Sequence, residues 1–76
     1  MTPEYNLVKS YMQKYKFKNP WTHLRIINEP TKTQYWFMGY GYTILLEKTF
    51  LRYTIKGTLA PFEQMPRITV EVPVGD

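Results

Sequence analysis

Side chains that could perform covalent or acid-base chemistry are scarce in this chain of 76 residues. It contains no cysteine, one histidine (His23) and one serine (Ser10). No spacing forces two carboxylates together, as general acid-base catalysis would require, and one imidazole with dispersed carboxylates is a poor metal-ligand set. We therefore expect a protein that is not an enzyme and that needs no metal or cofactor. The six dispersed acids are Glu4, Glu29, Glu47, Glu63, Glu71 and Asp76.

Basic residues beside aromatic rings are what the sequence supplies instead. Lysines alternate with rings from Lys14 to Lys18, through Tyr15, Lys16 and Phe17. An extended segment would place three ammonium groups on one side and two rings on the other. Single-stranded nucleic acid is bound by this combination, because cations attract its phosphates and flat apolar faces stack on its bases. The alternative is that the two rings anchor the end of a helix to the core while the lysines are solvated.

The segment from Tyr35 to Tyr42 is the second aromatic candidate. Thirteen of the 76 residues are aromatic, and so small a chain cannot easily enclose every ring. We expect some rings to remain at the surface, where they are common anchors for proteins as well as for bases. The alternative is that these rings form the core itself. With the basic residues of the expected strands, the candidate nucleic-acid-binding residues are Lys14, Lys16, Lys18, Arg25, Trp36, Tyr40, Tyr42, Arg52 and Lys56.

Length, charge and hydropathy narrow the class of protein. We expect a single domain over residues 1–76, since the chain is close to the lower size limit for one apolar core. Ten Lys and Arg against six Asp and Glu give a net charge of +4, which favours anionic partners. The absence of cysteine fits a reducing, cytoplasmic compartment. No stretch approaches the ~20 apolar residues that span a bilayer, so we expect no membrane partner.

The elements that must position these residues begin with a helix. Thr2, Pro3 and Glu4 read as an N-cap, a proline at the first helical position and an acid in the first turn. We predict a helix from Pro3 to about Lys14. Its apolar residues recur at steps of three and four and form one stripe that faces a sheet. They are Leu7, Val8, Tyr11, Met12 and Tyr15.

Alternating patterns predict strands in the rest of the chain. In the first, from Trp21, residues Thr22, Leu24 and Ile26 share one face. Gly39 and Gly41 indicate a bulge or bend of the sheet. A fourth strand is expected to place Leu51, Tyr53 and Ile55 inward, while the rival interpretation makes residues 43–53 a helix. The strands are expected at 21–27, 33–38, 42–47, 50–56 and 67–72, with a tight turn at 48–49, a loop at 58–66 and a short strand open as an alternative at 58–60.

This order of elements predicts an α+β fold. The N-terminal helix would pack on a strongly bent, mostly antiparallel sheet of about five short strands, and we expect the bend to close it into a small barrel.

Tyr42 to Thr49, together with the element order, resembles the Sm-like fold and the bacterial Sm-like RNA chaperones of the Hfq type. The likeness would cover the helix and residues 21–59. It implies that Tyr42 stacks on a base and that Lys56 stands at the lysine that lines a central pore. Ile55 and Gly57 replace the tyrosine and the histidine that flank this lysine in the family.

Two functions from different classes follow. The first is a small basic module that binds single-stranded nucleic acid or RNA through Lys, Arg and aromatic side chains. The second is a protein-interaction or inhibitor module, encoded by a virus or mobile element, that docks on a host protein through the aromatic strand or a sheet edge. Homo-oligomerisation into a ring or dimer would bury the aromatic strand and is left open.

Overall fold

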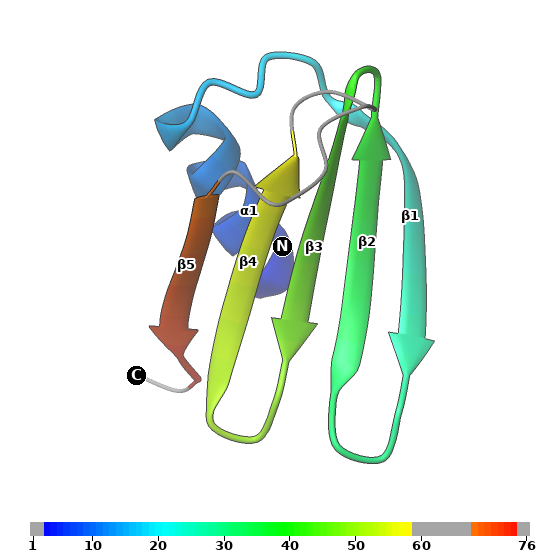
Figure 1. Ribbon diagram of the computed structural model, residues 1–76, viewed down its shortest axis with the longest axis vertical. Coiled ribbons are helices and arrows are strands. Elements are labelled where there is room, and N and C mark those ends of the chain that lie inside the picture. The colour runs from blue at the N-terminus through cyan, green and yellow to red at the C-terminus, as the bar shows by residue number, and fades with distance from the viewer. Residues whose placement is uncertain (1–2, 59–67, 75–76) are drawn as a thin grey trace.

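One helix and five strands make up the computed structural model, which describes residues 3–58 and 68–74 (Figure 1). The sheet is a meander of antiparallel neighbours, hydrogen-bonded in the order β1-β2-β3-β4-β5. The α+β class is therefore confirmed. The elements are α1 (Pro3–Lys14), β1 (Trp21–Asn28), β2 (Thr33–Gly39), β3 (Tyr42–Lys48), β4 (Arg52–Thr58) and β5 (Ile68–Pro73).

The helix starts and ends where local chemistry predicts. Pro3 and Glu4 occupy its first turn, whereas the predicted N-cap Thr2 lies outside the described residues. At the other end Lys16 adopts a φ of 64°, and the Phe17 N–H donates to the Met12 carbonyl at 2.9 Å. This is a Schellman arrangement, which satisfies a terminal carbonyl and turns the chain back toward the core. The cap therefore delivers Phe17 into the interior.

The sheet is open at both edges in the described part of the chain. The strand order begins at β1 and ends at β5, and these two strands are not paired with each other, so the expected barrel closure is not confirmed. Residues 43–53 form a β-hairpin, with Leu46 opposite Ile55, and the rival helical interpretation is wrong. The alternative strand at 58–60 falls largely outside the described residues, although Thr58 ends β4.

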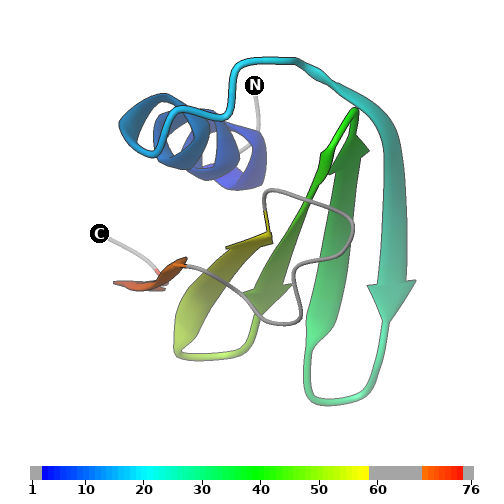
Figure 2. The same ribbon diagram turned by 45° about the horizontal axis from the view of Figure 1, so that its top comes forward.

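Helix α1 covers one face of this sheet, and both views place it on the same side (Figure 2). The side chains that β2, β3 and β4 direct toward α1 are its core partners, and together with the helix stripe they form one apolar cluster. Tyr5 of α1 makes edge contacts with Trp21 and Phe37, at ring-centroid distances of 6.0 and 5.9 Å. The fully enclosed residues are Val8, Phe37, Ile44, Leu46 and Ile55.

Two expectations about turns and strand phase are wrong. The glycine pair does not bend a strand from within: Gly39 ends β2, and Gly41, with a φ of 81°, lies in the tight β2–β3 turn. The irregularity of the sheet is instead in β1, where the register shifts between Trp21 and His23. This shift places Trp21 against the core together with Leu24 and leaves Thr22 exposed.

The β3–β4 turn is longer than expected. It spans residues 49–51, so β4 starts at Arg52, and Leu51 is 64% exposed instead of facing inward. Thr49 closes the turn, because its hydroxyl accepts the N–H of Leu51 at 3.3 Å and of Arg52 at 3.2 Å. This hydroxyl substitutes for the backbone partners that a two-residue turn would have supplied.

At Gly57 in β4, two rings from the end of the helix and the segment after it pack directly against the sheet backbone. A β-carbon at this position would lie 2.7 Å from the Tyr11 hydroxyl and 2.8 Å from the Phe17 ring. Both rings are buried, so neither can move away freely. Burial raises the pKa of Tyr11 to about 12, as expected for a phenol held in an apolar site.

Glu4, in the first turn of α1, links the start of the helix to the end of the sheet at which β3 and β4 are joined. It is 8% exposed, accepts a hydrogen bond from the Tyr53 hydroxyl at 3.0 Å and pairs with Lys48 at 3.4 Å. Burial acts to raise the pKa of Glu4, but its own backbone N–H, Tyr53 and Lys48 outweigh that effect and hold this pKa below its ordinary value.

We expect Glu4→Gln to lower the free energy of unfolding by about 1–2 kcal/mol at neutral pH, because hydrogen bonds to a charged group contribute more than neutral ones. The folded-state pKa is depressed, so the carboxylate contributes fully above its unfolded value near 4.5 and loses its contribution as the pH falls through the folded value. Denaturant titrations should show the difference from wild type narrowing in acid. Glu71→Gln, in an exposed pair, is the control, and a pH-independent difference would contradict this account.

Gly57→Ala should destabilise the fold by about 1–3 kcal/mol, since the added methyl group overpacks the contact between β4 and the two buried rings. Thr54→Ala is the matched control, because Thr54 lies in the same strand on the other face; we expect less than about 0.5 kcal/mol there. Thermal and denaturant unfolding measure both variants. Equal stability of Gly57→Ala and wild type would show that the rings are not held against this glycine.

Candidate nucleic-acid interface

The face of the sheet opposite α1 gathers candidate residues in one row. Strand register pairs Arg25 with Trp36, Trp36 with Leu45 and Leu45 with Lys56, so four neighbouring strands each contribute one side chain. Because alternate residues of a strand point to opposite faces, all four share the face that α1 does not cover. We call this set the cross-strand row. It consists of Arg25, Trp36, Leu45 and Lys56.

Trp36 sits in a polar network that positions its indole. Its ring N–H donates to the side-chain oxygen Oε1 of Gln34 at 3.4 Å, and the side-chain NH₂ of Gln34 donates to the Glu47 carboxylate at 2.7 Å. Lys32 pairs with the same carboxylate at 3.4 Å. The hydrogen bond from Gln34 is the main cause of a lowered pKa at Glu47, and the nearby cations Lys32 and Lys56 lower it further. The network satisfies the polar edge of Trp36 while its half-buried ring remains on the open face.

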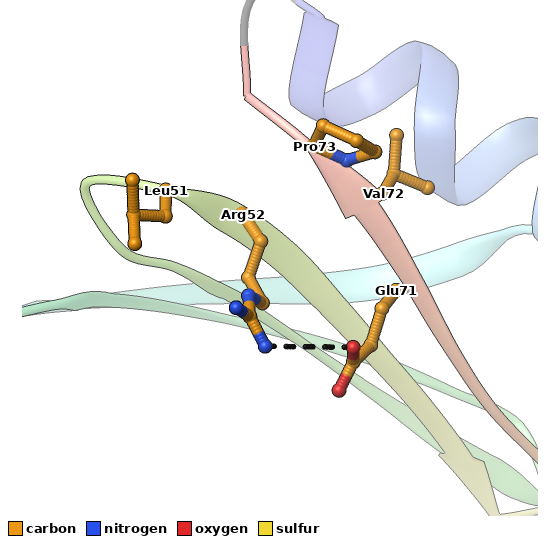
Figure 3. Close-up of a pocket in the computed structure, with 5 residues that line it drawn as sticks. All are labelled: Leu51, Arg52, Glu71, Val72 and Pro73. Carbon is orange, nitrogen blue, oxygen red and sulfur yellow. Dashed lines mark ion pairs between the residues drawn. The ribbon is translucent and has the colours of Figure 1, made fainter.

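The two cations of the row differ from most other basic groups of the sheet. Within residues 3–58 and 68–74, neither Arg25 nor Lys56 forms an ion pair with an acid. Arg52 also lies on the open face, but it pairs with Glu71 at 3.6 Å near the start of β4 (Figure 3). Arg25 is exposed and Lys56 is half-buried. The structure therefore brings together three of the predicted residues, Arg25, Trp36 and Lys56, and separates Arg52 from them.

Tyr42 does not belong to this surface, contrary to expectation. It lies on the helix side of the sheet, is only 6% exposed and makes an edge contact with Phe17 at 5.4 Å between ring centroids. Its hydroxyl donates to the Asn19 carbonyl at 2.6 Å, and burial raises its pKa. A β-carbon at Gly39 would overlap the Tyr42 ring. The ring is a structural part of the core and offers no stacking face.

The lysine-aromatic segment is likewise not an extended binding strand. Lys14 ends α1, Phe17 is 5% exposed and Tyr15 packs against the core. The alternative interpretation, in which the rings anchor the end of the helix, is therefore correct. The side chains of Lys14, Lys16 and Lys18 remain exposed. They add positive charge near the helix end, away from the cross-strand row.

Tyr40 is a free ring at the edge of the candidate surface. It is 84% exposed in the β2–β3 turn, next to the end of β2 that carries Met38 on the open face. With Phe50, which is 91% exposed, it confirms that the core does not absorb every ring. Sequence reasoning missed Leu45 and Gln34 as part of the site. Strand alternation alone places Gln34 on the same face as Trp36, two residues along β2, whereas only the pairing of β2 with β3 places Leu45 beside it.

Other kinds of site find little support among the described residues. His23 is exposed, with its Nδ1 at 3.0 Å from the Thr22 hydroxyl, and Ser10 belongs to α1 on the other side of the sheet. No group of three His, Asp or Glu side chains in residues 3–58 and 68–74 is arranged to hold a metal ion. No helix in the described ranges is long and apolar enough to cross a membrane.

No protein family model, curated protein or solved structure matches this chain. The resemblance to Sm-like RNA chaperones therefore remains a prediction.

Tyr42→Phe separates the structural role of this ring from a base-stacking role. We expect a loss of about 0.5–1.5 kcal/mol in the free energy of unfolding, because the Asn19 carbonyl loses its partner. Affinity for a labelled single-stranded oligonucleotide should not change, since the ring lies on the covered face. Denaturation and fluorescence anisotropy measure the two quantities, and a large loss of binding in a folded Tyr42→Phe variant would contradict this assignment.

Proposed function

We propose that this protein binds single-stranded nucleic acid on the open face of its sheet, with the cross-strand row as the centre of the site. The observation that carries the proposal is the register that places Trp36 and Leu45 between two cations, neither of which lies within ion-pair distance of a carboxylate in the described residues. Lys56 is still near enough to Glu47 to lower the pKa of that carboxyl. Lys48 and Arg52, the other two Lys and Arg residues in the described strands, each pair with a carboxylate.

Each part of the row has a physical role. A base stacks on the half-buried indole of Trp36, and the aliphatic Leu45 extends the apolar floor on which the sugar or a second base rests. Arg25 and Lys56 approach the phosphates from the two sides. Their backbone positions are three strand spacings apart, roughly 14 Å, which leaves room for a nucleotide unit between them. A guanidinium also stacks on bases, so Arg25 next to Trp36 can serve both purposes.

Specificity should be low in this arrangement. A ring face and two cations recognise what all bases and phosphates share, so binding tolerates sequence and depends strongly on salt. The net charge of +4 and the exposed lysines at the end of α1 strengthen long-range attraction without contacting the base. The polar network around Gln34 and Glu47 limits the row on one side, because a carboxylate there repels phosphate.

We expect Trp36→Ala to weaken binding of a labelled oligothymidylate of about ten nucleotides by about fivefold to a hundredfold, since one stacked base contributes ~1–3 kcal/mol. Arg25→Gln and Lys56→Gln should each weaken binding and reduce the slope of log affinity against log salt by about 0.7, the value for one phosphate contact on a single strand. Fluorescence anisotropy from about 50 mM to about 200 mM salt measures both quantities.

Arg52→Gln is the matched control, because it removes an equal charge from the open face at a residue that Glu71 already pairs. It should change affinity and salt slope much less than Arg25→Gln does. Circular dichroism must show that every variant is folded. Wild-type protein that binds no oligonucleotide at the lowest salt, or a Trp36→Ala variant that binds like wild type, would refute the proposed function.

A protein-docking function is the second candidate, and one observation favours it. β1 is an edge strand, and Ile26 on it is 49% exposed. Exposed apolar edges are surfaces on which an extended partner segment can add a strand. Ile26→Lys would abolish such docking and leave oligonucleotide binding intact, because Ile26 lies on the opposite face from the cross-strand row.

A further inference from the structure

The carboxylates of the described residues leave one end of the open face without negative charge. Glu47 and Glu71 lie on that face in a single register row, because both pair with Thr54. Glu29 lies beyond this row in the β1–β2 turn, and Glu4 belongs to α1 on the covered face. The acids of residues 3–58 and 68–74 are therefore all absent from the end of the open face at the β2–β3 turn.

A second row of side chains crosses this end of the open face, next to the cross-strand row. His23 on β1 pairs with Met38 on β2, and Met38 pairs with Thr43 on β3. Each of these residues is two positions from a member of the cross-strand row on the same strand, so it points to the same face. His23 is exposed, whereas Met38 and Thr43 are half-buried. We call His23, Met38 and Thr43 the histidine row, and the two rows form one surface that contains no acid.

The spacing of Arg25 and His23 along β1 matches a stretched nucleic-acid backbone. The two residues are two positions apart on one face of the strand, which puts their backbone positions roughly 6.5 Å apart. Duplex DNA advances about 3.4 Å per nucleotide of one strand, and an extended strand with unstacked bases advances about twice as far. Successive phosphates of such a strand can therefore meet Arg25 and His23 in turn.

The charged and titratable groups around His23 are cations and one phenol. Arg25 follows it on β1, and the exposed Lys18 precedes it in the segment that leads from α1 into β1 (Figure 1). From β2 the apolar Met38 lies opposite, with the phenol of Tyr40 in the turn beyond, and β3 adds no titratable group to the row. A protonated imidazole at this position has no carboxylate to pair with in the described residues, so an external phosphate can bind it.

The Thr22 hydroxyl determines which ring nitrogen of His23 is available. It donates to the Met38 carbonyl at 3.3 Å, and its oxygen lies 3.0 Å from Nδ1 of His23. A hydroxyl has one proton to donate, so it accepts from the Nδ1–H, and Nε2 of the neutral ring is left as an acceptor. Protonation changes Nε2 from an acceptor, which repels phosphate, into a charged donor that binds it.

We propose that the bound single strand continues from the cross-strand row onto the histidine row, where its next phosphate binds the protonated imidazole of His23 and the attached base lies on Met38. This inference rests on the proposed function, because it extends the same site by one nucleotide. The polarisable thioether of Met38 packs favourably against aromatic rings. Affinity rises as the pH falls, since imidazole is the side chain that ordinarily changes charge between pH 5 and 8. Glu47 and Glu71, on the other side of the cross-strand row, repel phosphate and so favour this direction.

Affinity for a labelled oligothymidylate of about ten nucleotides, measured by fluorescence anisotropy at about pH 5.5 and at about pH 8, tests the histidine row. Thymine does not change charge in this range, and His23 is the single histidine of the chain. We expect wild-type protein to bind about three- to tenfold more tightly at the lower pH, as for one added phosphate contact. The slope of log affinity against log salt should steepen there by about 0.7.

Substitutions of His23 fix its charge in either state. His23→Gln should bind equally at the two pH values, like wild type at the higher pH, because an amide carries no charge. His23→Arg should also lose the pH dependence, but it should bind as tightly as wild type does at the lower pH, because a guanidinium is always charged. Arg25→Gln is the matched control, which should weaken binding at both pH values and retain the ratio between them. Circular dichroism must show that each variant is folded.

A relocated histidine separates a phosphate contact from a general effect of charge. The double variant His23→Gln, Gln13→His carries the titrating group at an exposed position of α1, on the covered side of the sheet, and its salt slope should not change with pH. Wild-type binding that depends on Trp36 but not on pH, or a pH dependence that persists in His23→Gln or is reproduced by the double variant, overturns this inference and leaves the proposed function standing. A wild-type protein that binds no oligonucleotide overturns both.

Discussion

The packing of a single helix against a five-stranded sheet is the constraint on which the rest of this structure depends. α1 spans twelve residues and can shield only one face of the sheet, so the two faces have different roles. The covered face contributes the fully enclosed side chains Phe37, Ile44, Leu46 and Ile55. The other face must satisfy its polar groups and tolerate water. A small chain with one helix therefore presents a half-apolar sheet surface as a direct consequence of its size.

Aromatic rings supply five of the ten buried hydrophobic side chains of the described residues. Large rings bury much area, but they require space and, in tyrosine, a partner for the hydroxyl. Gly57 and Gly39 supply the space, because each lacks the β-carbon that would collide with a ring. Backbone and side-chain acceptors supply the partners: Tyr42 donates to Asn19, and Tyr53 donates to Glu4. No buried side-chain polar atom of the described residues is left without a hydrogen bond.

Charge pairing divides the basic side chains of the sheet into two groups. Lys32, Lys48 and Arg52 are each within ion-pair distance of a carboxylate, and these pairs support the hairpins and the helix. Arg25 and Lys56 have no such acid among the described residues, and they flank the one tryptophan of the open face. An anionic ligand can therefore approach them without first breaking an ion pair, which lowers the cost of binding, although Glu47 lies near enough to Lys56 to interact with its charge.

Local sequence signals determined most of the secondary structure. The proline and acid at the start of α1, the three-to-four spacing of its apolar residues and the alternation in the strands act over a few residues, and these features are visible without a fold. The sequence pattern did not predict the structure where one segment is compatible with two local conformations. The alternation of lysine with rings from Lys14 to Lys18 is compatible with an extended strand and with a helix cap. In the structure Lys16 has a left-handed conformation and Phe17 is buried, so the segment forms the cap.

The composition of the candidate surface, in contrast, was decided by tertiary structure. The sequence by itself determined that rings and cations are abundant, that acid-base groups are few and that some rings must reach solvent, because composition and length set those limits. Which residues meet was decided by strand register and by the side of the sheet that α1 covers. Register placed Arg25, Trp36 and Lys56 in one row and the helix buried Tyr42, since contacts between residues distant in the chain exist only after the strands have paired.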